Sequence, residues 1–363
     1  MLTILHAADF HLDAPFDGLT PEQAANRREE QRQLLGKLAE LQQDCRADVV
    51  LLPGDLFDRG DASQETGEAV RKALCAMNAP VIIAPGNHDY LAARSPYRSL
   101  VWSNNVHIFT GEAMEQVELQ GLDCVVHGCA FTSPYRDDDP LRGFMAPRDG
   151  KIHLGVLHGD VGAKSRYAPI DEASIAVSGL HYLALGHVHA ASPLQKTGDT
   201  SWAYSGCLQG RGFDELGEKG ALVVTLEGDR RQARFVPLPA RRYEILSVDV
   251  SQGDPLAALA AALPEDAQED IYRILLTGES DVAGLDLAPL RALAEPRFYS
   301  VSLRDTTVVR HDIWQRAQEE TLTGCFLREM KGRLEKASES EAETLFKAVR
   351  FGLAALERRE VPR

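Results

Sequence analysis

The chain contains five short apolar stretches, each followed within a few residues by polar side chains that can bind a metal ion. In the clearest case, the apolar residues 49–52 are followed by a Pro-Gly break and then by Asp55. Four consecutive residues of this kind indicate a strand buried on both faces. In an open α/β sheet, ligands bind beyond the carboxyl ends of the strands. A single Asp there is more often a turn former or a helix cap, so the other strand ends decide whether Asp55 has a function.

The other four stretches end in the same kinds of residue. The stretches at 2–5, 81–84, 152–157 and 182–185 are followed, in chain order, by Asp9 and His11, by Asn87, His88 and Asp89, by His158, and by His187 and His189. In the D-x-H and H-x-H pairs the residues are two positions apart, so in extended backbone both side chains of a pair point to the same face. We therefore expect the five strand ends to deliver ligands to one place.

The expected ligands are carboxylates, an amide and imidazoles, with no thiolate among them. Such ligands suit Mn²⁺, Fe²⁺ or Zn²⁺ better than a structural cysteine–zinc site. Seven ligands are too many for one ion and suit two ions that share a carboxylate, which we assign to Asp55 because its strand is central. Two such ions clamp an in-line displacement at phosphorus and lower the pKa of a water between them. The predicted ligands are Asp9, His11, Asp55, Asn87, His158, His187 and His189.

His88 is then left as a general acid near the leaving oxygen, and Asp89 is placed to orient its imidazole. His127 also follows a strand, but it has no neighbouring ligand type, and we interpret it as a structural histidine. A serine hydrolase is the non-metal alternative, and it lacks support because the sequence has no G-x-S-x-G elbow.

The composition is that of an ordinary globular protein, with 44% hydrophobic and 26% charged residues. No apolar run approaches the roughly 20 residues that span a bilayer, and the first residues lack the basic region of a signal peptide. The six cysteines are scattered and form no C-x-x-C pair, which is typical of reduced thiols. The sequence therefore predicts a cytoplasmic protein without membrane association.

A length of 363 residues fits two domains with an appendage. Residues 1–240 hold all the candidate ligands, residues 241–309 are expected to form a small α/β capping module, and residues 310–363 are expected to be helical. The last segment carries apolar residues at close to heptad spacing. Two interpretations remain open for it: a helix that lies on its own domain, or a short antiparallel helix pair that docks the helix or coiled coil of a partner.

The motifs D-x-H, G-D-x-x-D, G-N-H-D, H-G and G-H-x-H, in this order, resemble those of the calcineurin-like metallophosphoesterases. The resemblance implies an α/β class fold, an α/β/β/α sandwich of two facing mixed sheets with metals at the strand ends. It also implies how the ligands divide between two divalent ions, with Mn²⁺ expected and Fe²⁺, Zn²⁺ or Mg²⁺ as alternatives. Asp9, His11, Asp55 and His189 would hold one ion, and Asp55, Asn87, His158 and His187 would hold the other.

A narrower resemblance is to bacterial DNA repair exonuclease subunits of the SbcD and YhaO type, and it rests on residues 5–13, 167–169 and 204–211. It implies a DNA substrate, an SMC-like coiled-coil ATPase as partner, and a homodimer. The formal net charge of −15 argues against a chain that grips DNA alone, so the partner and the capping module would supply that grip. Candidate local phosphate contacts are Arg59, Lys164, Arg166 and Arg211.

Two other functions remain open. The segment 54–60 also resembles the G-D-x-x-D-R-G motif of Ser/Thr phosphatases, which favours a phosphomonoesterase or phosphoprotein phosphatase. Against this, Asp89 stands where those phosphatases carry Glu, and the chain has a long carboxy-terminal extension. The second alternative is a scaffold that has lost catalysis and only links DNA ends or a partner. The complete ligand set argues against it.

Overall fold

The structure is a computed structural model that describes residues 1–162, 164–280, 285–309 and 311–356. The chain divides into two compact units, Met1–Arg242 and Tyr243–Arg363. All the candidate metal ligands lie in the first unit. The expected further division near residue 310 stays a prediction.

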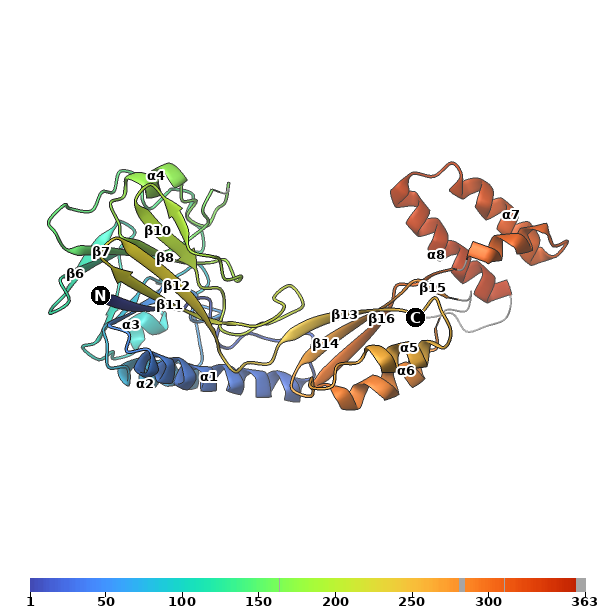
Figure 1. Cartoon of the computed structure of the whole chain (residues 1–363), viewed down its shortest axis with the longest axis horizontal. Coiled ribbons are helices and arrows are strands. Elements are labelled where there is room, and N and C mark those ends of the chain that lie inside the picture. Colours follow the sequence, from blue (N-terminus) through green and yellow to red (C-terminus); the bar gives the residue numbers. More distant parts are fainter. Residues whose placement is uncertain (163, 281–284, 310, 357–363) are drawn as a thin grey trace. The chain divides into compact units, whose positions relative to one another are not determined.

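The first unit contains two mixed six-stranded sheets (Figure 1). In the first sheet four parallel strands are extended by an antiparallel hairpin that pairs with β1. Its strands, in spatial order, are β12 (Arg230–Pro237), β11 (Gly220–Glu227), β1 (Leu2–His6), β2 (Val49–Leu52), β3 (Val81–Ile83) and β4 (Val106–Ile108). The strands that end in Asp55 and in Asp9 are therefore neighbours at the middle of this sheet.

The second sheet has a parallel centre with an antiparallel strand at each edge. Its strands, in spatial order, are β5 (Glu115–Leu119), β6 (Cys124–Gly128), β7 (Ile152–His158), β8 (Tyr182–Gly186), β10 (Thr200–Tyr204) and β9 (Gln195–Thr197). The strands that end in His158 and His187 are likewise central neighbours.

The two sheets pack face to face through one apolar cluster that includes Ile4 and Leu51 from the first sheet and Val156 and Ala184 from the second. Helices α1 (Pro21–Asp44) and α2 (Gln64–Cys75) cover the outer face of the first sheet. The short helix α4 (Glu172–Val177) packs on the outer side of the second sheet, and α3 (Pro96–Ser99) is a single turn. The expected α/β/β/α sandwich is confirmed.

Helix α1 begins where the sequence predicts. The Thr20 side chain accepts a hydrogen bond from the Gln23 backbone, and the Gln23 side chain accepts one from the Thr20 backbone. This capping box satisfies amide groups that have no partner within the first helical turn. Further along the helix Arg27 is fully buried, packs over the Phe16 ring, and donates to the Gly210 carbonyl at 3.1 Å. That bond ties α1 to the loop after β10.

The second unit begins with a three-stranded parallel sheet made of β13 (Tyr243–Asp249), β14 (Ile271–Thr277) and β16 (Ser300–Asp305). Helices α5 (Pro255–Ala262) and α6 (Leu287–Ala294) pack on one of its faces. A small strand pair, β15 (Glu279–Ser280) and β17 (Val308–Val309), lies beside it. This is the small α/β module that the sequence predicts, and no candidate ligand comes from it.

The last segment is helical, as expected, with a 3₁₀ stretch (His311–Gln318) followed by α7 (Leu322–Leu334) and α8 (Glu339–Leu356). The apolar stripes of the two helices pack against each other, with Leu327 and Met330 from α7 and Val349 and Leu353 from α8 buried. The apolar residues that suggested a docking surface for a partner are therefore largely buried between α7 and α8. No helix in the described part of the chain is both long enough and apolar enough to cross a membrane.

Candidate metal centre

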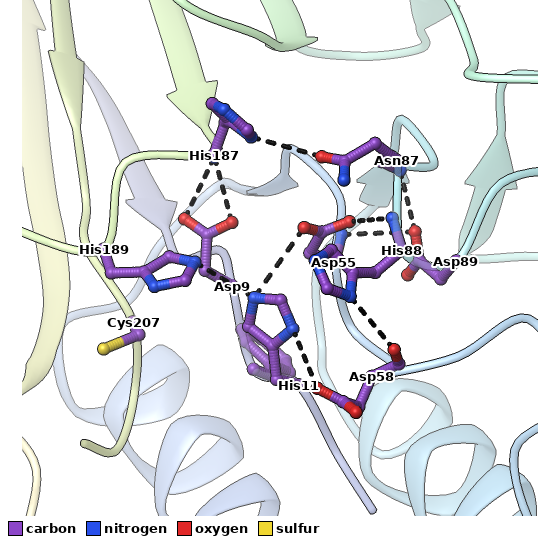
Figure 2. Close-up of polar contacts among 12 residues, drawn as sticks. Asp9, His11, Asp55, Asp58, Asn87, His88, Asp89, His187, His189 and Cys207 are labelled. Atoms are coloured by element: carbon purple, nitrogen blue, oxygen red, sulfur yellow. Dashed lines mark hydrogen bonds and ion pairs between the residues drawn. The ribbon is translucent and has the colours of Figure 1, made fainter. Parts of the chain in front are cut away.

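The strand ends of the first sheet continue side by side past the last ladder residue. Backbone N–H groups of Asp9 and His11 donate to the carbonyls of Gly54 and Asp55, at 3.1 and 2.9 Å. This pairing carries the Asp9, His11 and Asp55 side chains to one point, where the ends of the second sheet bring His187 and His189 (Figure 2). The two sheets thus supply opposite sides of one centre.

Four of these ligand-type residues have backbone in the left-handed region: Asp9, His11, Asp55 and His187 have φ of 54°, 45°, 51° and 99°. Residues other than glycine rarely adopt such angles, and each instance costs of order 1–3 kcal/mol unless the surroundings hold it. In an extended strand the side chains would alternate between faces. The strained backbone turns these four toward a shared centre, and such outliers are typical of functional sites.

Two glycines allow the sheets to approach each other at the centre. Gly54 has φ of +80°, and a Cβ built there would lie 2.6 Å from the Gly86 nitrogen and 2.8 Å from His158 Nδ1. A Cβ on Gly186 would clash with the Pro53 carbonyl. Any side chain at either position would push the strand ends apart.

The first group of ligand atoms comes from Asp9, His11 and His189, all within 4.8 Å of one another. The Nε2 atoms of His11 and His189 face each other at 3.1 Å, and Asp55 Oδ2 lies 3.7 Å from His11 Nε2. Glu215 accepts a hydrogen bond from His189 Nδ1 at 2.7 Å. Because a carboxylate only accepts, His189 carries its proton on Nδ1 and directs the Nε2 lone pair into the group.

The second group comes from Asp55, His158 and His187, again within 4.8 Å. Asn87 joins it, because its Oδ1 lies 2.8 Å from His158 Nε2 and 3.1 Å from His187 Nδ1. Asp55 Oδ2 is 3.3 Å from His158 Nε2. Asp55 therefore borders both groups, as a bridging carboxylate would.

The partners of the two His158 ring nitrogens show that the centre is arranged to bind a positive charge. Its Nδ1 donates to the Pro53 carbonyl at 2.9 Å, so in the neutral ring Nε2 holds a lone pair. That lone pair faces two oxygens, from Asn87 and Asp55. Only a proton on Nε2 or a cation between these atoms makes the contact favourable. The donor set fits two divalent metal ions.

The ionisation of the carboxylates follows from burial and from these neighbours. Burial raises the pKa of Asp9 to about 6. Burial would also raise the pKa of Asp55, but the charge and hydrogen bond of His158, together with His11 and His88, hold that pKa well below its ordinary value. Burial would lower the pKa of His158, yet Asp55 and Asp9 together raise it to about 9. The same negative potential would attract metal cations.

His88 lies at the open side of the centre. It is exposed, its ring packs edge-on against His11 with centroids 4.7 Å apart, and its backbone N–H donates to Asp55 Oδ1. Its Nδ1 donates to the Asp58 carbonyl at 3.1 Å. This bond orients the ring and leaves Nε2 for another partner.

The predicted role of Asp89 is wrong. The Asp89 carboxylate does not touch the His88 imidazole; it is fully buried and accepts from the backbone N–H groups of Gly86 and Leu56, both at 2.7 Å, and from the Tyr97 hydroxyl at 2.5 Å. It also accepts longer bonds from Asp55 and Phe57. The side chain points back under the turn, where it holds two strand ends together. The residue that orients His88 is Asp58, through its carbonyl.

The four predicted phosphate contacts have different surroundings. Arg59, Lys164 and Arg166 are exposed, and Arg166 packs over the Tyr135 ring at 4.2 Å. Arg59 borders a hollow of about 330 Å³ lined also by Asp13, Pro15, Asp58, Asp61 and Ala62. Arg211 is mostly buried and bonded to Glu215 and Asp58. His127 lies away from the centre and contacts His153 at 2.9 Å, in line with its structural interpretation.

Glu215 is a polar residue of this centre that the motifs do not contain. It is almost fully buried and lies in the loop between β10 and β11. Burial would raise its pKa, but hydrogen bonds from His189 and Arg211 hold the pKa well below the ordinary value. No sequence motif pointed to Glu215 itself. The nearest residue that the sequence singled out is Arg211, which ends the segment 204–211 of the resemblance to the SbcD and YhaO type.

Comparison with known proteins places the chain among metallophosphoesterases. It is 28% identical over 272 residues to the uncharacterized metallophosphoesterase YhaO of Bacillus subtilis, covering 71% of this chain and 65% of that one. It is 27% identical over 272 residues to the DNA double-strand break repair protein Mre11 of Aeropyrum pernix, covering 70% and 65%. The chain thus matches slightly less than two thirds of the length of each relative.

Among solved structures, an archaeal phosphodiesterase matches 65% of this chain and 100% of its own, at 14% identity and a TM-score of 0.36. The family pattern of the calcineurin-like phosphoesterases matches residues 2–191, which is more than half of the chain and includes every candidate metal ligand. The chain therefore belongs to the calcineurin-like phosphoesterases.

Proposed function

We propose that this chain is a two-metal phosphodiesterase that removes nucleotides from DNA ends in DNA repair. The observation that carries the proposal is the convergence of two ligand groups, Asp9–His11–His189 and Asp55–His158–His187, on the shared carboxylate of Asp55. Mn²⁺ is the ion that we expect for both groups from the family resemblance, and the mixture of carboxylate, amide and imidazole ligands is compatible with it.

When bound, two such ions polarise the phosphoryl oxygens and lower the pKa of a water between them. The chain's own residues supply position and protons. Asp55 keeps its negative charge at neutral pH, because its pKa is held low. His88 donates Nδ1–H to the Asp58 carbonyl, so in its cationic form the second ring proton sits on the exposed Nε2. We assign to this proton the protonation of the leaving oxygen, and His88 is the general acid.

The DNA substrate is supported by the relative from Aeropyrum pernix, whose name describes a DNA double-strand break repair protein. Arg59, Lys164 and Arg166 are exposed cations of the first unit and are the proposed phosphate contacts. With a net charge of −15, the chain gains most of its DNA affinity from a partner in this proposal.

The proposed partner is an SMC-like coiled-coil ATPase that docks on the α7–α8 pair. The inner stripes of these helices are occupied by each other, but Leu322, Phe346 and Phe351 are 72%, 37% and 47% exposed. Large apolar side chains at such exposure are the kind that a partner helix covers. A homodimer remains an expectation from the family resemblance.

A phosphomonoesterase or phosphoprotein phosphatase is the second candidate. It is favoured by the exposed Arg59 directly after Asp58, because an arginine there could hold a terminal phosphate. A catalytically silent scaffold is the third, and the convergence of both ligand groups opposes it.

One assay separates the three functions. The purified chain is incubated with Mn²⁺ and either linear DNA or a small phosphomonoester, with the Asp55→Asn variant as the inactive control. We expect the natural chain to release nucleotides from the linear DNA and the Asp55→Asn variant to release none. Hydrolysis of only the monoester would overturn the nuclease proposal. Turnover of neither substrate, with or without the ATPase, would support the scaffold.

A further inference from the structure

Glu215 is a buried carboxylate outside the ligand set that contacts the imidazole of a predicted ligand. Glu215 Oε1 accepts from His189 Nδ1 at 2.7 Å, and Glu215 is 5% exposed. The buried Glu215 carboxylate accepts hydrogen bonds from four groups. They are the His189 ring, the Arg211 guanidinium, the Arg211 backbone N–H, and the Cys207 thiol at 3.9 Å. A buried charge with this many donors is held in one orientation.

Arg211 connects Glu215 to a second carboxylate. Its Nη2 donates to Glu215 Oε1 at 2.9 Å and its Nη1 to Asp58 Oδ1 at 3.2 Å. Asp58 Oδ1 in turn lies 3.4 Å from His11 Nδ1. The outward nitrogens of His11 and His189 therefore both face carboxylates, and one guanidinium holds these two carboxylates at a fixed separation.

The other ligand group is supported differently, because only one of its two outward nitrogens faces a carboxylate. His158 Nδ1 is held by the backbone carbonyl of Pro53, and His187 Nε2 lies 3.4 Å from Asp160, whose side chain is 22% exposed, against 5% for Glu215. Carboxylate partners increase the basicity of an imidazole and fix its tautomer, whereas a carbonyl fixes the tautomer with less effect on basicity. The two groups thus differ in what lies behind their histidines.

We propose that Glu215 is a positioning residue that, through His189 and with Arg211 and Asp58, sets the affinity of the Asp9–His11–His189 group for its ion. The proposal rests on the two-metal assignment and does not depend on DNA as substrate. It also changes the role of Arg211, whose Nε and Nη2 donate to Glu215 and whose Nη1 donates to Asp58 in this structure. Arg211 then supports the metal ligands, and phosphate binding is left to other cations.

The test measures stepwise Mn²⁺ binding to the full chain by equilibrium dialysis and by electron paramagnetic resonance, which distinguishes a coupled pair of ions from a single one. We expect the natural chain to bind two ions. In Glu215→Gln one dissociation constant rises by about 10- to 100-fold and the other is unchanged, so a single-ion spectrum appears at intermediate Mn²⁺. Glu215→Ala removes the acceptor completely and gives the larger effect.

Asp214→Asn is the matched control, because it removes the same charge from the exposed neighbouring side chain. It should leave both dissociation constants unchanged. If Glu215→Gln weakened the binding of both ions equally, the effect would be a general one on charge or folding, and the proposal would be overturned. The same conclusion would follow if Asp214→Asn raised a dissociation constant as much as Glu215→Gln does. Two ions bound by Glu215→Gln with natural affinities would also overturn it. A natural chain that binds no ions would instead contradict the two-metal assignment itself.

Discussion

The Nε2 atoms of His11 and His189 face each other at 3.1 Å, and the Nδ1 atom of each ring faces a carboxylate oxygen, at 3.4 Å for Asp58 and 2.7 Å for Glu215. Glu215 holds the His189 proton on Nδ1, so the Nε2 lone pair of His189 points at His11 Nε2. A divalent ion at this point would be coordinated by both Nε2 atoms.

Removal of divalent ions by a chelator should therefore lower the thermal midpoint of the chain, and Mn²⁺ should restore it. Ions that bind only the folded state add about 2.7 kcal/mol each when their concentration is 100 times the dissociation constant. Differential scanning calorimetry with and without Mn²⁺ measures the shift. Asp55→Asn, which weakens both groups, should lose most of it. An equal midpoint in both conditions would argue against bound metal.

Replacement of His88 by Ala should leave both ions bound and lower turnover by about 10²- to 10⁴-fold, the usual contribution of a general acid. His88 contributes its backbone N–H to Asp55, and that bond survives the change. Metal content and steady-state rate on a small phosphodiester are measured on the same sample. If metal is lost in parallel with rate, His88 is a ligand and not the acid.

Asp89→Asn should destabilise the chain by at least about 2 kcal/mol, because an amide cannot accept from all the buried donors that the carboxylate satisfies and its NH₂ would face other N–H groups. Urea unfolding measures the difference. Tyr97→Phe removes only one of these donors and should cost less. An Asp89→Asn variant with natural stability but no turnover would restore a direct catalytic role for Asp89.

Acid should destabilise the first unit through His6. Its Nε2 donates to the Leu185 carbonyl, its Nδ1 accepts from Tyr182, and burial lowers its pKa to about 3 from 6.5. Between these values the unfolded chain binds a proton that the folded chain does not, so stability falls by about 1.4 kcal/mol per pH unit as the pH drops below about 6.5. His6→Gln keeps a donor and an acceptor without titrating, and its unfolding free energy should fall less steeply over pH 6 to 4. An identical slope in both proteins would exclude His6.

Replacement of Phe346 and Phe351 by Ser should leave the α7–α8 pair folded, because neither side chain belongs to its buried core. Hydrolysis of small substrates should be unchanged, since all candidate ligands lie in the first unit. Co-purification with a coiled-coil ATPase should weaken strongly. Leu353→Ala removes a side chain from the core between the helices and serves as the control for unfolding of the pair. The helix content of all variants is measured by circular dichroism. Undiminished binding by the double variant would contradict the docking surface.

The sequence was sufficient where a local rule decides the outcome. The capping box at Thr20 depends on residues three apart, and the buried strands before Asp55 and His158 are short apolar runs with a clear stop. Parallel strands place their carboxyl ends on one edge, so the ligand-type residues of each sheet were expected to be neighbours, whereas the meeting of two facing sheets was expected only from the family resemblance.

The sequence failed where side-chain direction or long-range pairing decides. Asp89 lies next to His88 in the chain, but the turn sends its carboxylate inward, to amides more than 30 positions away as well as to nearby Gly86. Glu215 lies 26 positions after His189 and in no ligand motif. Its contact with His189 depends on the path of the loop after β10, and the apolar periodicity of a sequence does not predict the path of a loop.

The burial of Arg27 has a consequence for how the centre is built. This side chain anchors the Gly210 carbonyl to a 24-residue helix, one residue before the arginine that bridges Asp58 and Glu215. The loop therefore takes its geometry from the longest rigid element of the first unit. A substitution on the buried face of α1, with no atom near a ligand, would therefore disturb the loop that holds Arg211 and Glu215, and through it the metal centre.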